Sequence, residues 1–228
     1  MRMRRKKNLE ERLAAVSDYL FISNFEDRNF NTAKEKKEYI DFGGWFGEEK
    51  TIYLEIGCGK GKFACEYAKN NPDINLIAVE KSGNVIVEAC EKAKEMGLKN
   101  LKFIKCGAEY LEKYIMPQSI ARIFLNFSCP FPKAAYATHR LTHLRFLEIY
   151  KRIMKKDAEI HQKTDNMHFF EFSLEQLSLG GFALKNISLD LHNSGFEGNI
   201  ETEYEHRFVS LGQPIYRLEA YLMGENND

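Results

Sequence analysis

The stretch TIYLEIGCGKG, Thr51 to Gly61, decides the fold of this chain. A short apolar run from Ile52 to Ile56 includes one acidic residue, Glu55, and leads into glycines at positions 57, 59 and 61. A buried parallel strand that feeds a glycine-rich turn and then a helix gives this pattern, because glycine takes positive φ and lets backbone approach a ligand closely. The sequence therefore predicts a turn that holds a nucleotide.

The spacing of the glycines indicates which nucleotide is bound. Dinucleotide-binding folds use G-x-G-x-x-G, whereas here the third glycine comes one residue early and Lys62 takes its expected place, which disfavours NAD. The order Glu55-x-Gly57-x-Gly59-x-Gly61 instead resembles the first motif of class I S-adenosylmethionine (SAM) methyltransferases. In that fold the acid that closes the second strand accepts hydrogen bonds from the ribose, and Glu80 ends the run INLIAVE. A structural turn without a ligand is the alternative.

Composition and charge set outer bounds on the function. With 228 residues, 44% of them hydrophobic, the chain can bury one full core, with or without a small extension. Lys+Arg and Asp+Glu both number 33, so a nucleic-acid surface must be a local patch. The five cysteines are odd in number and form no C-x-x-C, which is typical of reduced thiols in the cytosol. We find no signal peptide or long apolar run, and expect a cytoplasmic protein that does not bind membranes.

Strands and helices alternate regularly from Thr51 onward. We expect helices at 62–70, 84–96, 141–154 and 169–179, and strands at 51–56, 74–80, 101–106, 120–127, 159–163, 183–191 and 215–223. This order predicts an α/β, Rossmann-like class I methyltransferase fold, in which a seven-stranded, mostly parallel sheet carries helices on both faces and ends in a hairpin. Residues 49–228 would form this domain, with residues 1–48 as an N-terminal extension.

The extension begins with a basic arm. Residues 1–7, MRMRRKK, carry five cations and no acid, and a helix is expected at Leu9 to Leu20. The arm is either a solvated tail or a segment that contacts phosphate.

Two later loops follow expected strands. NFSCPFPK, residues 126–133, comes after the fourth strand, and Thr164-Asp165-Asn166 comes after the fifth. Ligands bind at the carboxyl ends of strands in doubly wound sheets, so the methyl group should point toward these loops. By the same likeness to methyltransferases, Gly107, Ala108 and Glu109 after the third strand are the candidates for cradling adenine.

Five segments together suggest a family. LEIGCGKGKF, LNFSCPFPK, RLTHLRFLEIYKRIM, EIHQKTDN and FEGNIETEYEHRF, in this order, resemble the bacterial tRNA (guanine-N7)-methyltransferases, over nearly the whole chain. The resemblance implies methyl transfer from SAM to N7 of a guanine in the tRNA variable loop, position 46. It implies tRNA as partner, no metal, and a monomer or homodimer with no obligatory protein partner.

The resemblance also assigns residues to roles. Position 129 and Asp165 would be catalytic. SAM would be held by Glu55, Gly57, Gly59, Glu80, Gly107, Ala108 and position 129, and the guanine or its tRNA by Lys133, Asp165, Thr202 and Glu205.

Departures from the family pattern fall in one loop. The family has an aspartate where this chain has Cys129, a tryptophan at Phe131, and a basic run where Ala134 to Arg140 has lost most of its cations. Guanine N7 has a free lone pair and needs no general base, so the enzyme supplies mainly orientation and a favourable field. Loss of one charged hydrogen bond costs about 1.5 to 3 kcal/mol. We therefore expect activity that is reduced roughly ten- to a hundred-fold, and not abolished.

Several alternatives remain open at this point. Asp165-Asn166 could cap the next helix, Glu205 could be a solvated charge and Thr202 a turn residue. Residues 128–131 partly resemble the motif of amino-methyltransferases, and Cys129 could be the nucleophile of a pyrimidine C5 methyltransferase. The chain could also be an inactive paralogue that binds SAM or RNA without turnover.

Overall fold

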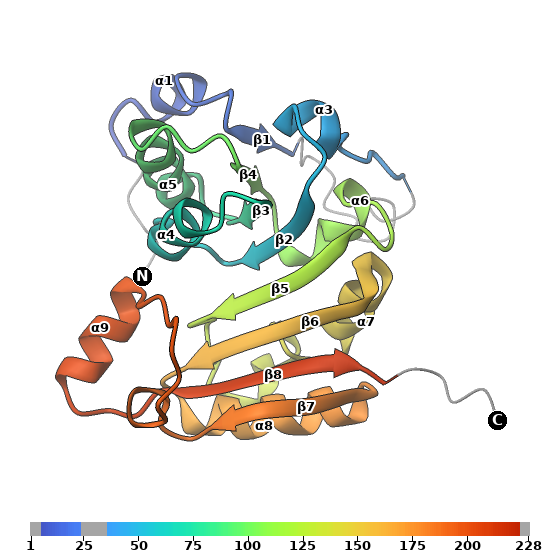
Figure 1. The fold of residues 1–228 in the computed structure, drawn as a ribbon, viewed down its shortest axis with the longest axis vertical. Coiled ribbons are helices and arrows are strands. Elements are labelled where there is room, and N and C mark those ends of the chain that lie inside the picture. The colour runs from blue at the N-terminus through green and yellow to red at the C-terminus, as the bar shows by residue number, and fades with distance from the viewer. Residues whose placement is uncertain (1–5, 24–35, 224–228) are drawn as a thin grey trace. The chain divides into compact units, whose positions relative to one another are not determined.

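The computed structural model describes residues 6–23 and 36–223, which fall into two compact units with a boundary after Met116. Figure 1 traces both units, and we describe each by itself. Within the described residues no helix is long and apolar enough to span a membrane.

The first unit is built on four parallel strands in the order β1-β4-β3-β2. Residues Ile74–Val79 form β3, and Leu76 to Val79 are at most 1% exposed, so both faces of this strand are covered. Continuous apolar runs of this kind are typical of buried parallel strands. The other elements of the unit are α1 (Leu9–Ala14), β1 (Leu20–Ile22), α3 (Phe42–Phe46), β2 (Thr51–Ile56), α4 (Lys62–Asn70), α5 (Gly83–Glu95), β4 (Leu101–Lys105), η1 (Ala108–Tyr110) and α6 (Leu111–Tyr114).

The N-terminal extension differs from expectation. The expected helix from Leu9 to Leu20 ends at Ala14 and continues as turns, in which the backbone NH of Ser17 donates to the carbonyl of Ala14 at 3.2 Å. Leu20–Ile22 then pairs with β4 as an extra edge strand, with Leu20 opposite Phe103. The described part of the extension thus belongs to the first unit. Residues 1–5 of the basic arm lie outside the described residues.

The second unit is a mixed sheet in the order β5-β6-β8-β7. Strand β5 runs parallel to β6, and β8 runs antiparallel to both β6 and β7, which is the expected late hairpin. Figure 1 shows α7 and α8 on one side of these strands. The elements are β5 (Ile120–Asn126), η2 (Ala134–His139), α7 (Leu144–Ile153), β6 (Met154–Thr164), α8 (Met167–Leu179), β7 (Phe182–Ser188), η3 (Leu191–Asn193), α9 (Glu203–Ser210) and β8 (Tyr216–Leu222).

Strand β6 sorts its side chains into two environments. Ala158, Ile160 and Gln162 are at most 1% exposed, and Gln162 donates to Ser173 of α8 at 2.9 Å. The alternate residues Glu159, His161 and Lys163 point to the opposite face, because successive side chains of a strand alternate between its faces. This alternation places three charged or polar groups together on one face of the sheet.

The seven expected strands are all present, and β1 is an addition to them. Helix α9 is also additional, since we expected only a polar connection between the last two strands. Its start carries a capping box: Thr202 accepts from the backbone NH of Glu205, and the Glu205 side chain accepts from the backbone NH of Thr202. The T-x-x-E spacing that signals such a box is present in the sequence.

Candidate functional site

The glycine turn of the first unit is held against strand β3. The backbone NH groups of Gly57 and Cys58 both donate to the carbonyl of Val79, at 2.8 and 3.0 Å. Gly57, Gly59 and Gly61 have φ of 84°, 56° and 76°, a region that costs residues with a Cβ about 1 to 2 kcal/mol. The sequence places three glycines where the backbone requires them.

The three glycines differ in their surroundings. A Cβ added to Gly57 or Gly59 would meet nothing within 4 Å, whereas one added to Gly61 would lie 2.6 Å from the Cβ of Ala89 in α5. Gly61 therefore serves the close packing of α4 against α5. Gly57 and Gly59 face open space, which leaves room for a ligand against the backbone.

The other expected cofactor residues lie at the ends of the neighbouring strands. Glu80 follows β3, and its side chain accepts from the backbone NH of Ser82 at 2.8 Å through one oxygen. Gly107 and Ala108 follow β4, where the carboxylate of Glu109 lies over Gly107, 2.6 Å from a Cβ built there. Because β2, β3 and β4 are parallel neighbours, their carboxyl ends meet at one edge. The first unit thus gathers the expected cofactor residues at this edge, except Cys129, which lies on the loop after β5 in the second unit.

Two acidic side chains lie near the glycine turn. Glu55 is 2% exposed and lies within β2 immediately before the turn. Burial raises the pKa of the Cys58 thiol, and the nearby charges of Glu55 and Glu80 raise it further. Cys58 is thus kept as a neutral thiol beside two acidic side chains.

The loop after β5 has strained backbone. Phe127 and Phe131 have φ of 49° and 42°, and positive φ at a bulky residue costs on the order of 1 to 3 kcal/mol. The backbone NH of Phe127 donates to the carbonyl of Lys163 at 2.8 Å. The guanidinium of Arg140 donates to the carbonyls of Pro130 and Phe131 at 2.9 and 3.0 Å. The loop is thereby held at Phe127 and at Pro130 and Phe131.

Arg140 is a residue that our sequence reasoning missed. Its guanidinium carbon lies 4.4 Å from the ring centroid of Phe172, so it also ties the loop to α8. A cation in an otherwise depleted basic run gave no signal for a contact with loop carbonyls. Cys129 and Lys133, which we did single out, are exposed on this loop.

Asp165 does not cap the helix that follows it. Asn166 is the cap of α8, and its side-chain oxygen accepts from the backbone NH of Phe169 at 2.8 Å. No side chain in the described segments donates a hydrogen bond to Asp165, which is partly buried. Burial raises the pKa of its carboxyl above the ordinary value of 3.8. The carboxylate is therefore available to a ligand.

Glu205 and Thr202 are buried, with 0% exposure of the Glu205 side chain. Glu205 is not a solvated charge, because one of its oxygens receives a hydrogen bond from the ammonium of Lys163 at 2.7 Å. Burial alone would raise the pKa of Glu205, but the charge and hydrogen bond of Lys163, together with the hydrogen bonds from Asn199 and the Thr202 backbone, hold it below the usual value. Lys163, which joins the expected residues here, was not among those we singled out.

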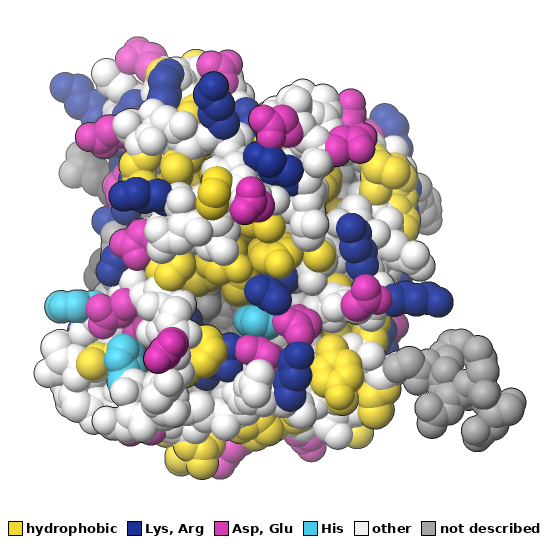
Figure 2. Space-filling view, in the orientation of Figure 1, with side chains coloured by type: hydrophobic (Ala, Val, Ile, Leu, Met, Phe, Trp, Pro, Cys, Tyr) yellow, Lys and Arg dark blue, Asp and Glu magenta, His cyan; other side chains and the backbone are white. Residues whose placement is uncertain are grey.

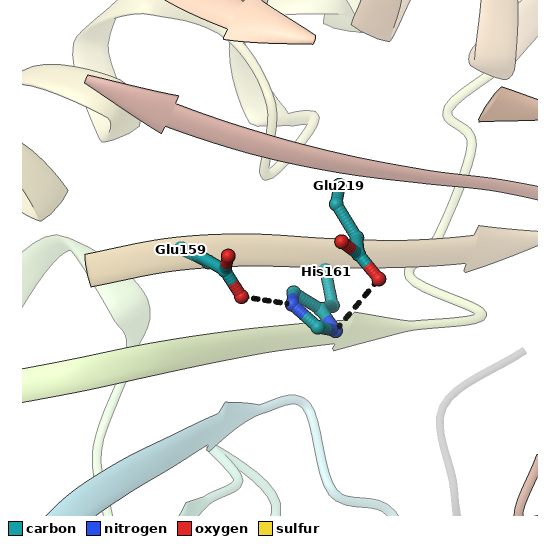
Figure 3. A group of neighbouring side chains, drawn as sticks. All are labelled: Glu159, His161 and Glu219. Atoms are coloured by element: carbon teal, nitrogen blue, oxygen red, sulfur yellow. Dashed lines mark hydrogen bonds and ion pairs between the residues drawn. The ribbon is translucent and has the colours of Figure 1, made fainter. Parts of the chain in front are cut away.

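Charged side chains gather on the β6 and β8 part of the second unit, where Figure 2 shows dark blue, magenta and cyan groups together. In Figure 3, His161 lies between Glu159 and Glu219, and its Nε2 is 2.8 Å from Glu159. The geometry resembles a metal site. Glu159, however, already pairs with Lys185, and Glu219 with Arg217. Because a metal ion would have to displace both cations, we assign this group to an ion-pair network, and the expected absence of a metal stays a prediction.

Sequence comparison finds a matching family and close relatives. A family described as "Putative methyltransferase" matches residues 49–218. The tRNA (guanine-N(7)-)-methyltransferases of Bacillus cytotoxicus and Clostridioides difficile are 44% and 41% identical to the chain. Each alignment covers 96% of this chain and, respectively, 96% and 98% of the relative. That of Bacillus subtilis strain 168 is 43% identical, with coverage of 96% and 98%.

Solved structures agree on the fold. The chain is similar to a 30S ribosomal A1408 methyltransferase from an uncultured bacterium, with a TM-score of 0.56, 12% identity, and coverage of 87% of this chain and 96% of the other. It is also similar to a SAM-dependent methyltransferase from Aquifex aeolicus, with a TM-score of 0.53, 17% identity, and coverage of 78% and 86%. The expected class I methyltransferase fold is confirmed.

The glycine turn yields a stability prediction. Gly61→Ala adds a clash with Ala89 to the cost of positive φ, so it should lower the free energy of unfolding by about 2 to 4 kcal/mol. Gly59→Ala meets no atom and should cost only about 1 to 2 kcal/mol. Chemical denaturation of the two variants measures the difference, and equal losses would contradict the packing role of Gly61.

Proposed function

Because the chain belongs to the tRNA (guanine-N(7)-)-methyltransferase family, we propose that it transfers a methyl group from SAM to N7 of the guanine at position 46 of tRNA. The observation that carries the proposal is identity above 40% over 96% of the chain to relatives of that name. The gathering of cofactor-type residues at one edge of the first unit supports it.

The residues of this edge fit SAM chemically. The open side of Gly57 and Gly59 admits the methionine end of the cofactor, and Glu80 has a carboxylate oxygen to accept from ribose hydroxyls. The carboxylates of Glu55 and Glu80 favour the cationic sulfonium, which supplies an activated methyl group when SAM is bound. Gly107 and Ala108 would line the adenine.

The second unit would supply the guanine site. N7 carries a lone pair and no proton, so the chain needs to orient the base and stabilise the positive charge that the base gains. The Asp165 carboxylate, free of helix capping, can accept hydrogens from the Watson–Crick edge and offset that charge. Lys133 is exposed and can meet a phosphate. The family resemblance also assigns Thr202 and Glu205 to the guanine or its tRNA.

The proposal is tested by incubating the protein with labelled SAM and unmodified total tRNA, followed by nucleoside analysis for 7-methylguanosine. A tRNA transcript with adenine at position 46 serves as the control substrate. We expect label in 7-methylguanosine from tRNA and none from the control. SAM binding without any labelled nucleoside would favour the inactive paralogue, and label in another base would favour a different methyltransferase.

Asp165→Asn should lower kcat/KM for tRNA roughly ten- to a hundred-fold, because it removes one charged hydrogen bond worth about 1.5 to 3 kcal/mol. Asp157→Asn, an exposed aspartate of β6, is the matched control and should keep the wild-type rate. The raised pKa of Asp165 also predicts how activity depends on pH. The carboxylate is ionised above its pKa, so activity should fall as the pH drops through that value. Because the pKa is raised, this loss should begin at a higher pH than for an ordinary aspartate of pKa 3.8. An unchanged rate in Asp165→Asn would remove Asp165 from the mechanism.

Cys129→Asp should raise the rate, by up to roughly the ten- to hundred-fold that one charged hydrogen bond supplies. Cys129→Ser is the companion variant and should stay within a few-fold of wild type. Initial rates of 7-methylguanosine formation measure both. A complete loss of activity in Cys129→Ser would instead indicate covalent catalysis by the thiol.

A further inference from the structure

The ammonium of Lys163 is fully engaged inside the second unit. Its side chain is 8% exposed and donates to the Asn199 side chain at 2.9 Å, the Ile200 carbonyl at 2.8 Å and the Glu205 carboxylate at 2.7 Å. A lysine ammonium has three hydrogens to donate. All three are accounted for by the protein, so Lys163 has none to offer to an RNA phosphate.

The carboxylate of Glu205 is equally occupied. Besides Lys163, it accepts from the Asn199 side chain at 2.6 Å and from the backbone NH of Thr202 at 3.3 Å, and it contacts Nε2 of His192 at 3.0 Å. A carboxylate offers about four lone-pair positions. Four partners fill them, and the side chain has no exposed surface through which a base could approach.

Lys163 contacts three segments of the second unit. It lies at the end of β6, two residues before Asp165. Its backbone carbonyl accepts from Phe127 of the strained loop, and its side chain holds the segment from Asn199 to Glu205. The residue therefore connects every part of the second unit to which the proposed function assigns the guanine.

We propose that Lys163 is a positioning residue. Its buried ion pair with Glu205 fixes the Asn199–Glu205 segment against the strand end that presents Asp165, and Glu205 shapes the guanine site without touching the base. The inference rests on the proposed function and deepens it. It assigns Glu205 a different role from the contact with guanine that the family resemblance implies.

Kinetics of Lys163→Met, Glu205→Gln and the double variant test the inference. Residues that act as a unit show non-additive losses. Each single variant should lower kcat/KM for tRNA by roughly thirty-fold or more, mainly through KM, and the double variant should equal either single variant within about three-fold. The dissociation constant for SAM should stay within about two-fold, because SAM is assigned to the first unit.

Lys151→Met is the matched control. Lys151 pairs with Glu148 at the same distance of 2.7 Å, but on the solvated surface of α7, and exposed pairs contribute little. This variant should keep kcat/KM within about two-fold.

Removing one partner of a buried ion pair can prevent folding, so Asn199→Ala is a second probe. It leaves the ion pair intact and removes the amide that braces both partners. We expect an increase in KM for tRNA of about five-fold with little change in kcat.

The effect of Asp165→Asn, measured in two backgrounds, distinguishes a positioning role of Lys163 from a role in stability alone. In the Lys163→Met background, or in Asn199→Ala if the former does not fold, Asp165→Asn should cost several-fold less than in wild type, because Asp165 is already misplaced.

Three results would overturn the inference. The first is a double variant whose loss in kcat/KM is the product of the two single losses. The others are a loss of kcat/KM in Glu205→Gln but not in Lys163→Met, and an unchanged KM for tRNA in Asn199→Ala. Failure of the proposed function is distinguishable, since the wild type itself would then form no 7-methylguanosine.

Discussion

The carbonyl of Val79 anchors the part of the chain on which the rest depends. It accepts from two successive NH groups of the glycine turn, so the turn cannot move away from β3. Positive φ at three alternate glycines makes this tight path possible. Because the turn is fixed, the open sides of Gly57 and Gly59 remain next to Glu80, and a ligand site forms from backbone without any large side chain.

The second unit fixes its loops differently, through buried charge. A lysine and a glutamate that lie 42 residues apart meet with almost no exposure to water. Burial of charge is costly unless both groups are fully hydrogen bonded, and here each is. Arg140 likewise holds the loop after β5, because it donates to two loop carbonyls and packs over the ring of Phe172. Asp165 follows Lys163 by two residues, and neither the Lys163–Glu205 pair nor Arg140 uses its carboxylate.

The sequence predicted the parts of this structure that depend on local pattern. Apolar runs located β2 to β5, and alternate glycines located the turn, because strand patterns and positive φ act over a few residues. The three residues of β1 are too few for such a pattern. The helix from Leu9 ends where good helix formers give way to Val16, Ser17 and Asp18, which have lower helix propensity. The capping box at Thr202 was readable from its spacing, although we treated the segment as a connection.

Partners that are distant in sequence could not be predicted in this way. Nothing local to Lys163 indicates that its ammonium is buried against Glu205, and nothing local to Arg140 indicates loop carbonyls as its partners. The family resemblance singled out Thr202, Glu205 and Asp165 together. It did not indicate that Glu205 is buried and bonded to Lys163, whereas the carboxylate of Asp165 is available to a ligand. Those contacts depend on how the strands bring remote segments together.

Isothermal titration calorimetry with S-adenosylhomocysteine, the product of methyl transfer, tests the central claim most directly. The wild type should bind it with one site per chain. Glu80→Gln should weaken binding about ten-fold, because the ribose hydroxyls lose a charged acceptor, and Glu95→Gln, on the exposed side of α5, should not. An absence of binding by the wild type, or equal affinities in all three proteins, would contradict the assignment of the cofactor to the glycine turn.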